Sequence, residues 1–262
     1  MRNWGVFWGL IFILLGVLFL LDSLGLLPWN VWVVFWPVTL ILLGFTLLLG
    51  GFGRRRSMTT ENLALQLKGF EEAEVAIHYG AGRLLIGGGA APDELLNGVF
   101  GGGVEHQLGE EGERALVNLR LPASSYWDWR GWPERTWDIN LNADIPLDLI
   151  LETGASESLV DLSNTQTKSI KLKTGASSNE LLLPASAGRT KVEIEGGAGS
   201  ITVQVPDGVA ASIQGSVGAG AMTIDQAKFH RKGSVYRSLD YDQAANRVDI
   251  HVNFGAGEVR IS

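Results

Sequence analysis

The sequence predicts a two-helix transmembrane hairpin followed by an all-β soluble domain, in which bent strands stack as the rungs of a β-solenoid. Two observations lead to this fold class. Two long apolar runs occupy most of residues 4–52, and a tripeptide of Gly-Ala followed by Gly or Ser recurs six times in the remainder. The predicted divisions are the hairpin at 1–53, a basic linker at 54–61 and the repeat domain at 62–262.

Each copy of the repeat has the pattern of a strand, a tight bend and a second strand. Apolar residues alternate before and after each tripeptide, which gives each strand one buried face. Glycine allows a backbone bend that residues with a Cβ atom resist, and the alanine is expected to fit a small closed space. The first glycines of the copies, which we predict to be structural bends, are Gly80, Gly154, Gly175, Gly197, Gly218 and Gly255.

The spacing after the tripeptide depends on its third residue. In the Gly-Ala-Gly copies the apolar pair begins four residues after the first glycine, as at Leu84 and Ile86. In the two Gly-Ala-Ser copies the pair comes two residues later. These later pairs are Val160/Leu162 and Leu181/Leu183.

The period of the repeat favours stacked units over a nucleotide-binding loop. Four successive copies are separated by 21, 22 and 21 residues, and one such unit cannot bury its apolar face without neighbours. A dinucleotide-binding loop needs a third glycine and a following helix. Positions 85, 202, 223 and 260 hold Leu, Thr, Thr and Arg instead, and alternating strand patterns follow them.

The two apolar runs are long enough to form membrane-spanning helices. Residues 4–21 are all apolar or glycine, and a second run covers 31–52, so each can cross a hydrocarbon core of about 30 Å. A cleaved signal peptide is disfavoured, because the first run is too long and a second span follows at once. The short link between them contains the turn-forming residues Asp22, Ser23 and Pro28.

Basic residues predict the orientation of this hairpin. Arg2 precedes the first run and the consecutive residues Arg54, Arg55 and Arg56 follow the second, whereas the link has no Lys or Arg. The positive-inside rule then places both termini in the cytoplasm. The three arginines are interpreted as a topology signal, and binding of anionic lipid headgroups is the alternative.

The hairpin resembles the transmembrane region shared by LiaI- and LiaF-like bacterial proteins. The matching stretches include Trp4-Gly5, Leu14-Leu15-Gly16, Leu20-Leu21-Asp22 and Trp36-Pro37. The soluble part is similar to toast-rack domains related to LiaF and to adhesin-like proteins, in Tyr79-Gly80-Ala81-Gly82, Ile145-Pro146-Leu147, Gly154-Ala155-Ser156 and Leu182-Leu183-Pro184. This resemblance implies a role in the bacterial envelope-stress response, in which some members restrain a sensor kinase. The chain departs from LiaF in having two predicted spans where four are usual, and the resemblance supplies no catalytic residues.

A tryptophan-rich segment interrupts the regular pattern. It contains Trp127, Trp129 and Trp132. Gly131 and Pro133 favour a loop here, and the alternation of Trp137, Ile139 and Leu141 predicts inward positions of the next strand. Exposed tryptophans could form an interface, because they offer a large contact area at low entropic cost. The alternative is that they cover the terminal rung of the stack.

Composition excludes several classes of function. A net charge of −7 argues against nucleic-acid binding, and the absence of cysteine excludes disulfides, thiolate metal sites and cysteine nucleophiles. None of the four histidines, His78, His106, His230 and His251, lies three or four residues from another, so no zinc site is predicted. We therefore predict no catalytic, cofactor-binding or metal-binding residues and no enzyme activity. A carbohydrate-active enzyme, using acidic residues among Asp128, Glu134, Asp138 and Asp144, is the weaker alternative.

The sequence thus predicts a multi-pass protein of the bacterial inner (cytoplasmic) membrane with a cytoplasmic β domain. Its expected function is protein interaction or scaffolding, with a regulatory part in envelope stress. The expected partners are the lipid bilayer and another protein, such as a membrane sensor component, and exposed rung edges could join copies into a homo-oligomer. No cofactor and no nucleic acid are expected. The alternative function is an adhesin-like domain displayed outside the cell.

Overall fold

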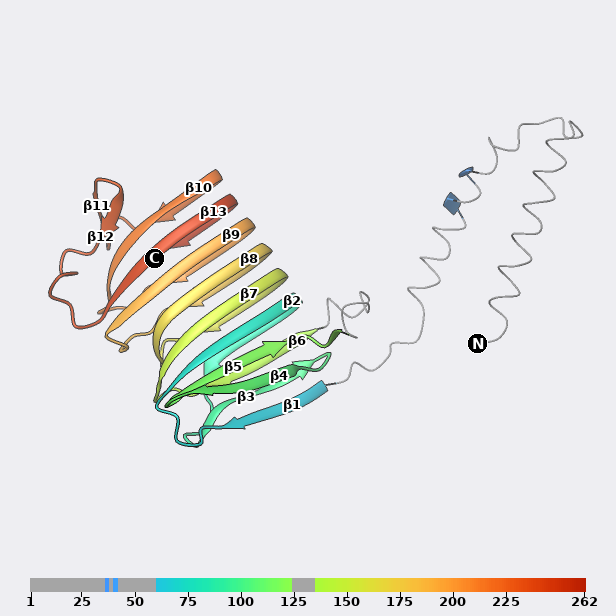
Figure 1. Cartoon of the computed structure of the whole chain (residues 1–262). Coiled ribbons are helices and arrows are strands. Elements are labelled where there is room, and N and C mark those ends of the chain that lie inside the picture. Colours follow the sequence, from blue (N-terminus) through green and yellow to red (C-terminus); the bar gives the residue numbers. More distant parts are fainter. Residues whose placement is uncertain (1–35, 38–39, 42–59, 124–134) are drawn as a thin grey trace, which may run out of the picture. The chain divides into compact units, whose positions relative to one another are not determined.

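Figure 1 shows the computed structural model of the chain, which describes residues 36–37, 40–41, 60–123 and 135–262. The chain divides into two units, Met1–Arg56 and Ser57–Ser262, and the β domain belongs to the second. Within the described ranges, no helix has the length and apolar character needed to cross a membrane. Most of the predicted hairpin lies outside these ranges, as do Arg54, Arg55 and Arg56.

The β domain is a single sheet of thirteen strands. The strands of its first half are β1 (Thr60–Gln66), β2 (Glu72–Gly88), β3 (Glu94–Gly101), β4 (Glu105–Glu111), β5 (Arg114–Arg120), β6 (Thr136–Leu141) and β7 (Pro146–Asp161). Those of its second half are β8 (Gln166–Leu182), β9 (Arg189–Gln204), β10 (Ala210–Ile224), β11 (His230–Lys232), β12 (Val235–Arg237) and β13 (Arg247–Ile261).

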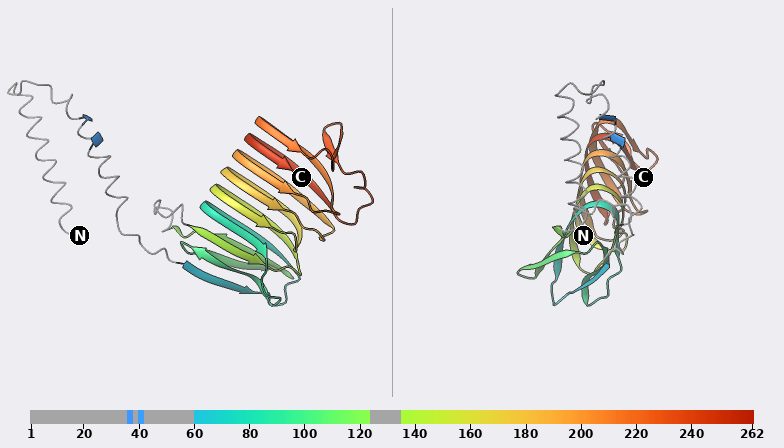
Figure 2. Two further views of the ribbon diagram at one scale, coloured as in Figure 1. Left: turned by 180° about the vertical axis from the view of Figure 1, so that it is seen from behind. Right: turned by 90° about the vertical axis from the view of Figure 1, so that its right-hand side faces the viewer.

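Six long, bent strands stack in parallel and form the rungs of a rack. In spatial order the rungs are β2, β7, β8, β9, β13 and β10. Each of these six rungs contains one copy of the tripeptide, and we call the parts before and after it the first arm and the second arm. Figure 1 shows the first arms in front, and the left view of Figure 2 shows the second arms in front.

The apolar residues of both arms point inward and form one core. On β2, Val75, Ile77 and Leu84 have no exposed surface. The pairs that follow the Gly-Ala-Ser copies are buried as the alternation predicted, with Leu162 and Leu183 both fully covered. Each such side chain gains about 1.5–3 kcal/mol from burial. A rung therefore contributes apolar residues from two directions to a core that only its neighbours can complete.

The rack begins with a rung that is split into two strands. β5 pairs in parallel with the first arm of β2, and β6 pairs in parallel with its second arm. Residues 121–135 connect β5 to β6, where the other rungs have the tripeptide. The strand β6 buries Trp137, Ile139 and Leu141 completely, as predicted. Beyond the split rung, the antiparallel strands β4 on β5, and β3 and β1 on β6, complete this end of the sheet.

The rungs do not follow the order of the sequence throughout. The C-terminal strand β13 lies between β9 and β10 and pairs with both along its whole length. Two glycines make room for it. A Cβ atom on Gly196 of β9 would lie 1.9 Å from the ring of Phe254, and one on Gly215 of β10 would lie 2.8 Å from the Val252 side chain and backbone oxygen. The last copy of the repeat is thereby paired on both sides within the sheet.

Candidate interaction surface

The first glycines of the repeat form a column that runs from rung to rung. A Cβ atom on Gly154 would lie 2.3 Å from the carbonyl oxygen of Gly80, and one on Gly255 would lie 2.5 Å from the carbonyl oxygen of Gly197. The corresponding distances are 2.9, 2.8 and 2.7 Å for Gly175, Gly197 and Gly218, each to the first glycine of a neighbouring rung. Side chains are excluded here because the rung backbones approach too closely.

The third residue of the tripeptide has a different backbone conformation in the two kinds of rung. In the Gly-Ala-Gly rungs it has positive φ, between +126° and +138°, at Gly82, Gly199, Gly220 and Gly257. This region of backbone space is accessible almost only to glycine. In the Gly-Ala-Ser rungs, Ser156 and Ser177 are not among the residues with positive φ.

The alanine of the tripeptide does not fit a closed space in each copy, and that expectation was wrong. Only Ala81 is buried, at 6% exposed, whereas Ala155, Ala176, Ala198 and Ala219 are exposed and Ala256 is half-buried. The close approach that requires a small residue falls on the preceding glycine. The exposed alanines thus form the outer surface of the bend.

The later apolar pairs of the Gly-Ala-Ser rungs do not arise from inserted residues. The ladder between β2 and β7 runs without a shift, with Leu84 opposite Ser158 and Ile86 opposite Val160. The inward position four residues after the first glycine is instead occupied by buried polar side chains, Ser158 on β7 and Asn179 on β8. A polar residue therefore replaces the first member of the apolar pair.

These residues belong to a buried polar cluster just inside the bend. Its members are Thr153, Ser156, Ser158, Thr174, Ser177 and Asn179. The Thr153 hydroxyl donates to that of Thr174 at 3.1 Å, which joins β7 to β8. Asn179 Nδ2 donates to Ser177 Oγ at 2.6 Å, whereas Asn179 Oδ1 is buried without a hydrogen-bond partner among the described residues.

An open groove crosses four rungs on the first-arm side of the bend. Its volume is about 710 Å³, and it is lined by Glu152, Thr153, Lys173, Thr174, Glu195, Gly196, Asn253 and Gly255. The lining combines charged side chains with two threonines, an asparagine and two glycines. Because β7, β8, β9 and β13 all contribute, the groove runs across the strands and exists only in the stacked rack.

Charges alternate over three neighbouring rungs of this groove, β7, β8 and β9. His78 of β2 lies opposite Glu152, Glu152 opposite Lys173, and Lys173 opposite Glu195. His78 Nδ1 and Glu152 Oε2 are 2.8 Å apart, and Lys173 Nζ and Glu195 Oε2 are 3.9 Å apart. The Lys173 and Glu195 side chains are 57% and 65% exposed, so exposed ion pairs of this kind contribute little to stability. The row of charges is available for contact with another molecule.

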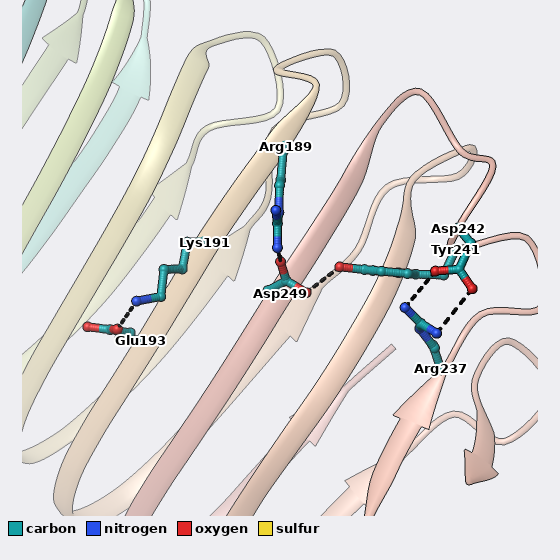
Figure 3. A network of polar contacts seen from close by, with 7 residues as sticks. All are labelled: Arg189, Lys191, Glu193, Arg237, Tyr241, Asp242 and Asp249. Carbon is teal, nitrogen blue, oxygen red and sulfur yellow. Dashed lines mark hydrogen bonds and ion pairs between the residues drawn. The ribbon is translucent and has the colours of Figure 1, made fainter.

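A second group of polar residues ties the inserted rung β13 to its surroundings, as Figure 3 shows. Arg189 of β9 donates to Asp249 Oδ2 of β13 through Nε at 3.0 Å and Nη2 at 2.8 Å. The Tyr241 hydroxyl donates to the other oxygen of Asp249. Arg237 stacks over the Tyr241 ring at 4.1 Å from its centroid and forms an ion pair with Asp242. The loop before β13, β13 itself and β9 are thereby linked.

Two groups of this network have pKa values that differ from their ordinary values. Burial raises the pKa of Asp249, but hydrogen bonds from Tyr241 and Arg189 outweigh burial and leave the pKa below its ordinary value. Burial and the hydrogen bond to Asp249 raise the pKa of Tyr241. The Asp249 contacts therefore stabilise the fold above the ordinary carboxyl pKa, and this contribution is lost as pH falls through the lowered pKa. The Tyr241 side chain is only 6% exposed.

Of the other residues singled out by the sequence, those that the structure describes do not form a chemical site. Trp127, Trp129, Trp132, Asp128 and Glu134 lie outside the described residues. Asp138 and Asp144 are exposed. No group of three or more His, Asp or Glu side chains within 60–123 and 135–262 is placed to hold a metal ion. Sequence reasoning missed the buried polar cluster, although its Ser and Asn residues interrupt the apolar alternation at the predicted inward positions.

Comparisons with known families match nearly the whole chain. Residues 53–204 match the N-terminal domain of toast_rack, DUF2154. Residues 6–48 match the LiaI-LiaF-like transmembrane region, which supports a membrane protein. Residues 183–261 match the family described as cell wall-active antibiotics response LiaF, C-terminal. None of these is described as an enzyme family.

Solved structures add a comparison of the fold. A proposed cell adhesion protein from Clostridium sporogenes ATCC 15579 is 24% identical, with a TM-score of 0.71 over 78% of this chain and 99% of that chain. A proposed adhesin from Bacteroides fragilis NCTC 9343 is 8% identical over 79% of this chain and 98% of that one, and its TM-score of 0.31 is too low to indicate a shared fold. A search of curated proteins gave no match. With more than half of its length matched, the chain belongs to the toast-rack family and combines this domain with LiaI-LiaF-like and LiaF-like regions.

Proposed function

We propose that the rack is a membrane-tethered protein-interaction domain that regulates the response of the bacterial envelope to stress. The observation that carries this proposal is the groove with alternating charges, which crosses β7, β8, β9 and β13 in a chain with a LiaF-like C-terminal match. The name of the matched family refers to cell wall-active antibiotics, and we infer that this chain acts in the same response.

The groove fits a partner that lies across the rungs. Neighbouring strands are about 4.8 Å apart, so Glu152, Lys173 and Glu195 present charges of alternating sign at this interval. Charges arranged in this way favour a partner with the complementary pattern and disfavour others. A segment whose charged groups alternate in the opposite order could pair with all three side chains. The partner we propose is another membrane protein of the stress response.

Reversing the central charge tests this function. Lys173→Glu would create three consecutive glutamates across the groove and should weaken partner binding about tenfold, equivalent to about 1.4 kcal/mol. We expect a correspondingly weaker induction of stress-response transcripts when cells receive a cell wall-active antibiotic. Lys232→Glu is the matched control, because it makes the same charge change at an exposed position on β11, away from the groove.

The responses of the two variants are compared to determine whether the groove has a role. Both proteins should accumulate in membranes to the level of the wild type, since both positions are exposed. A reduced response in Lys173→Glu with a normal response in Lys232→Glu supports the proposal. Equal responses in both variants and the wild type would contradict a role of the groove.

The second candidate function is adhesion, with the β domain outside the cell. It is favoured by a fold shared with the proposed cell adhesion protein of Clostridium sporogenes, although a shared fold alone carries no activity. The side of the membrane on which the β domain lies distinguishes the two candidate functions. Under our proposal the domain is cytoplasmic, as the arginines at 54–56 predict.

The absence of native cysteine allows a direct test of this position. Ser234→Cys places one thiol at an exposed position between β11 and β12. A membrane-impermeant maleimide should label it only after lysis if the domain is cytoplasmic, and labelling of intact cells would favour adhesion. Ala211→Cys, at a fully buried position, is the control for folding, because it should react only after denaturation.

A further inference from the structure

The last rung of the rack, β10, has a free edge. On one side β10 pairs in parallel with β13 from Ala210 to Ile224. On the other side, β12 pairs only with Ser212 and Ile213. Within the described ranges, no strand pairs with Gln214–Ile224 on that side. An edge of this kind presents a row of unpaired N–H and C=O groups that can pair with another strand.

The sequence of this edge lacks the features that prevent pairing. Residues 214–224 contain no charged residue and no proline, although natural edge strands usually carry one or the other. The opposite end of the rack differs. There, the edge strand β4 is exposed along its whole length and carries Glu105, Glu110 and Glu111. Charge therefore protects one end of the rack and not the other.

The apolar interior is also incompletely covered at the β10 end. Val217 and Met222 are inward-facing and only half-buried. Their counterparts on β13, Phe254 and Val259, are 1% and 0% exposed. One more rung stacked on β10 would cover these two side chains, as β13 covers Ile201 of β9.

We propose that this additional rung is β10 of a second copy of the chain, joined end to end in a two-fold dimer. The shape of the bend indicates which strand can pair with this edge. A strand that pairs with both arms of β10 must itself bend beside Gly218–Gly220 and have small residues there, and the β10 of another copy meets both conditions by symmetry. A two-fold axis that bisects the bend places the first arm of one copy antiparallel to the second arm of the other.

The faces of the arms restrict the register of this pairing. Opposed residues of an antiparallel pair point to the same face, so inward residues must meet inward residues. This condition is met when Val217 lies opposite Met222 of the second copy, and Ser216 lies opposite Thr223. The register shifted by one pair toward the N-terminus would require Ile213, which already pairs with Tyr236 of β12.

Cysteine cross-linking in membranes tests both the interface and its register. Two differently tagged chains are co-expressed, one with Ser216→Cys and the other with Thr223→Cys, both at exposed outward positions. Mild oxidation should give a disulfide-linked heterodimer in high yield. Chains with Ser216→Cys alone should link poorly to each other. Gln107→Cys on the exposed strand β4 is the control for random collision and should give only a background yield.

A charge variant gives an independent measurement. Ser216→Lys combined with Thr223→Lys would set like charges opposite each other at both outer pairs, and we expect the detergent-solubilised full chain to change from dimer to monomer by light scattering. A protein that stays dimeric in this variant, or that shows no link between positions 216 and 223, would overturn the proposal. The cross-link excludes a dimer held only by the membrane region, because such a dimer leaves the β10 edges apart. The Lys173→Glu test of the proposed function does not depend on this result.

Discussion

The Gly-Ala-Gly and Gly-Ala-Ser rungs form the same bend by different chemistry. In the former, the third glycine has positive φ, and an apolar residue such as Leu84 or Ile201 fills the next inward position. In the latter, the third residue is a buried serine, and Ser158 or Asn179 fills that position. The two kinds of rung nevertheless pair in continuous register.

This difference indicates that the bend depends more on the close packing of neighbouring rung backbones than on the exact tripeptide sequence. All six bent rungs have the first glycine of the tripeptide. In the five rungs beyond β2, a Cβ atom on this glycine would collide with the backbone of a neighbouring rung. The third residue can vary because the backbone has no positive φ at Ser156 and Ser177, and their buried hydroxyls are hydrogen-bonded. Buried polar groups are tolerated when they are paired, and Asn179 Oδ1 is an exception within the cluster.

Among the variants that test this comparison, the largest loss of stability is expected for a substitution of Gly199. Its φ is +128°, and a Cβ atom there would lie 1.9 Å from the carbonyl oxygen of Ser177. Gly199→Ala should lower the free energy of unfolding by about 3 kcal/mol or more, measured by urea denaturation. Ser156→Ala, at the equivalent position of a Gly-Ala-Ser rung, loses one hydroxyl contact and should cost about 1 kcal/mol. Equal losses in the two variants would remove the distinction between the rungs.

An intermediate loss of stability is expected when the residue before the first glycine of the tripeptide is substituted. Tyr79 is buried, and its hydroxyl lies 2.9 Å from the carbonyl oxygen of Arg135 and 3.1 Å from that of Arg83, whereas the Gly-Ala-Ser rungs have a threonine here. Tyr79→Phe should cost about 1–2 kcal/mol at neutral pH.

The same variant makes a prediction for alkaline pH. Burial raises the pKa of Tyr79 well above its ordinary value of 10.0. The folded state therefore keeps the proton that the unfolded state loses, and stability falls as pH rises above about 10. Denaturation midpoints between neutral pH and pH 11 should fall more steeply for the wild type than for Tyr79→Phe. Parallel curves would show that Tyr79 keeps an ordinary pKa. Tyr241 remains in both proteins, so its own raised pKa cancels in the difference.

The smallest change in stability is expected for a substitution of Asn179, which lies opposite Ile201 of the next rung. Asn179→Leu would restore the apolar inward position of the Gly-Ala-Gly rungs and remove a buried oxygen that has no partner among the described residues. We expect the free energy of unfolding to stay within about 1 kcal/mol of the wild type, because the gain in apolar burial offsets the lost contact with Ser177. A loss above about 2 kcal/mol would mean that the polar cluster is required for the Gly-Ala-Ser bend.

The alternation of apolar residues predicted much of the rack. It located the inward residues of β2, β7 and β8 because a strand places every second side chain on one face. It did not reveal the groove or the Asp249 network, since these join residues of different rungs. Arg189 and Tyr241 meet Asp249 only because β13 lies beside β9. The interface suggested for Trp127, Trp129 and Trp132 stays a prediction.

The sequence by itself determined that this chain has bent strands with one apolar face, since both follow from local periodicity and from glycine at fixed positions. It also determined the apolar character of the N-terminal runs and the family of the chain. Only the tertiary structure decided the order of the rungs. Gly196 and Gly215 leave space for a bulky neighbour, but which strand fills that space depends on packing between segments far apart in the chain. For the same reason, the edge left free on β10 became visible only when β13 was placed between β9 and β10.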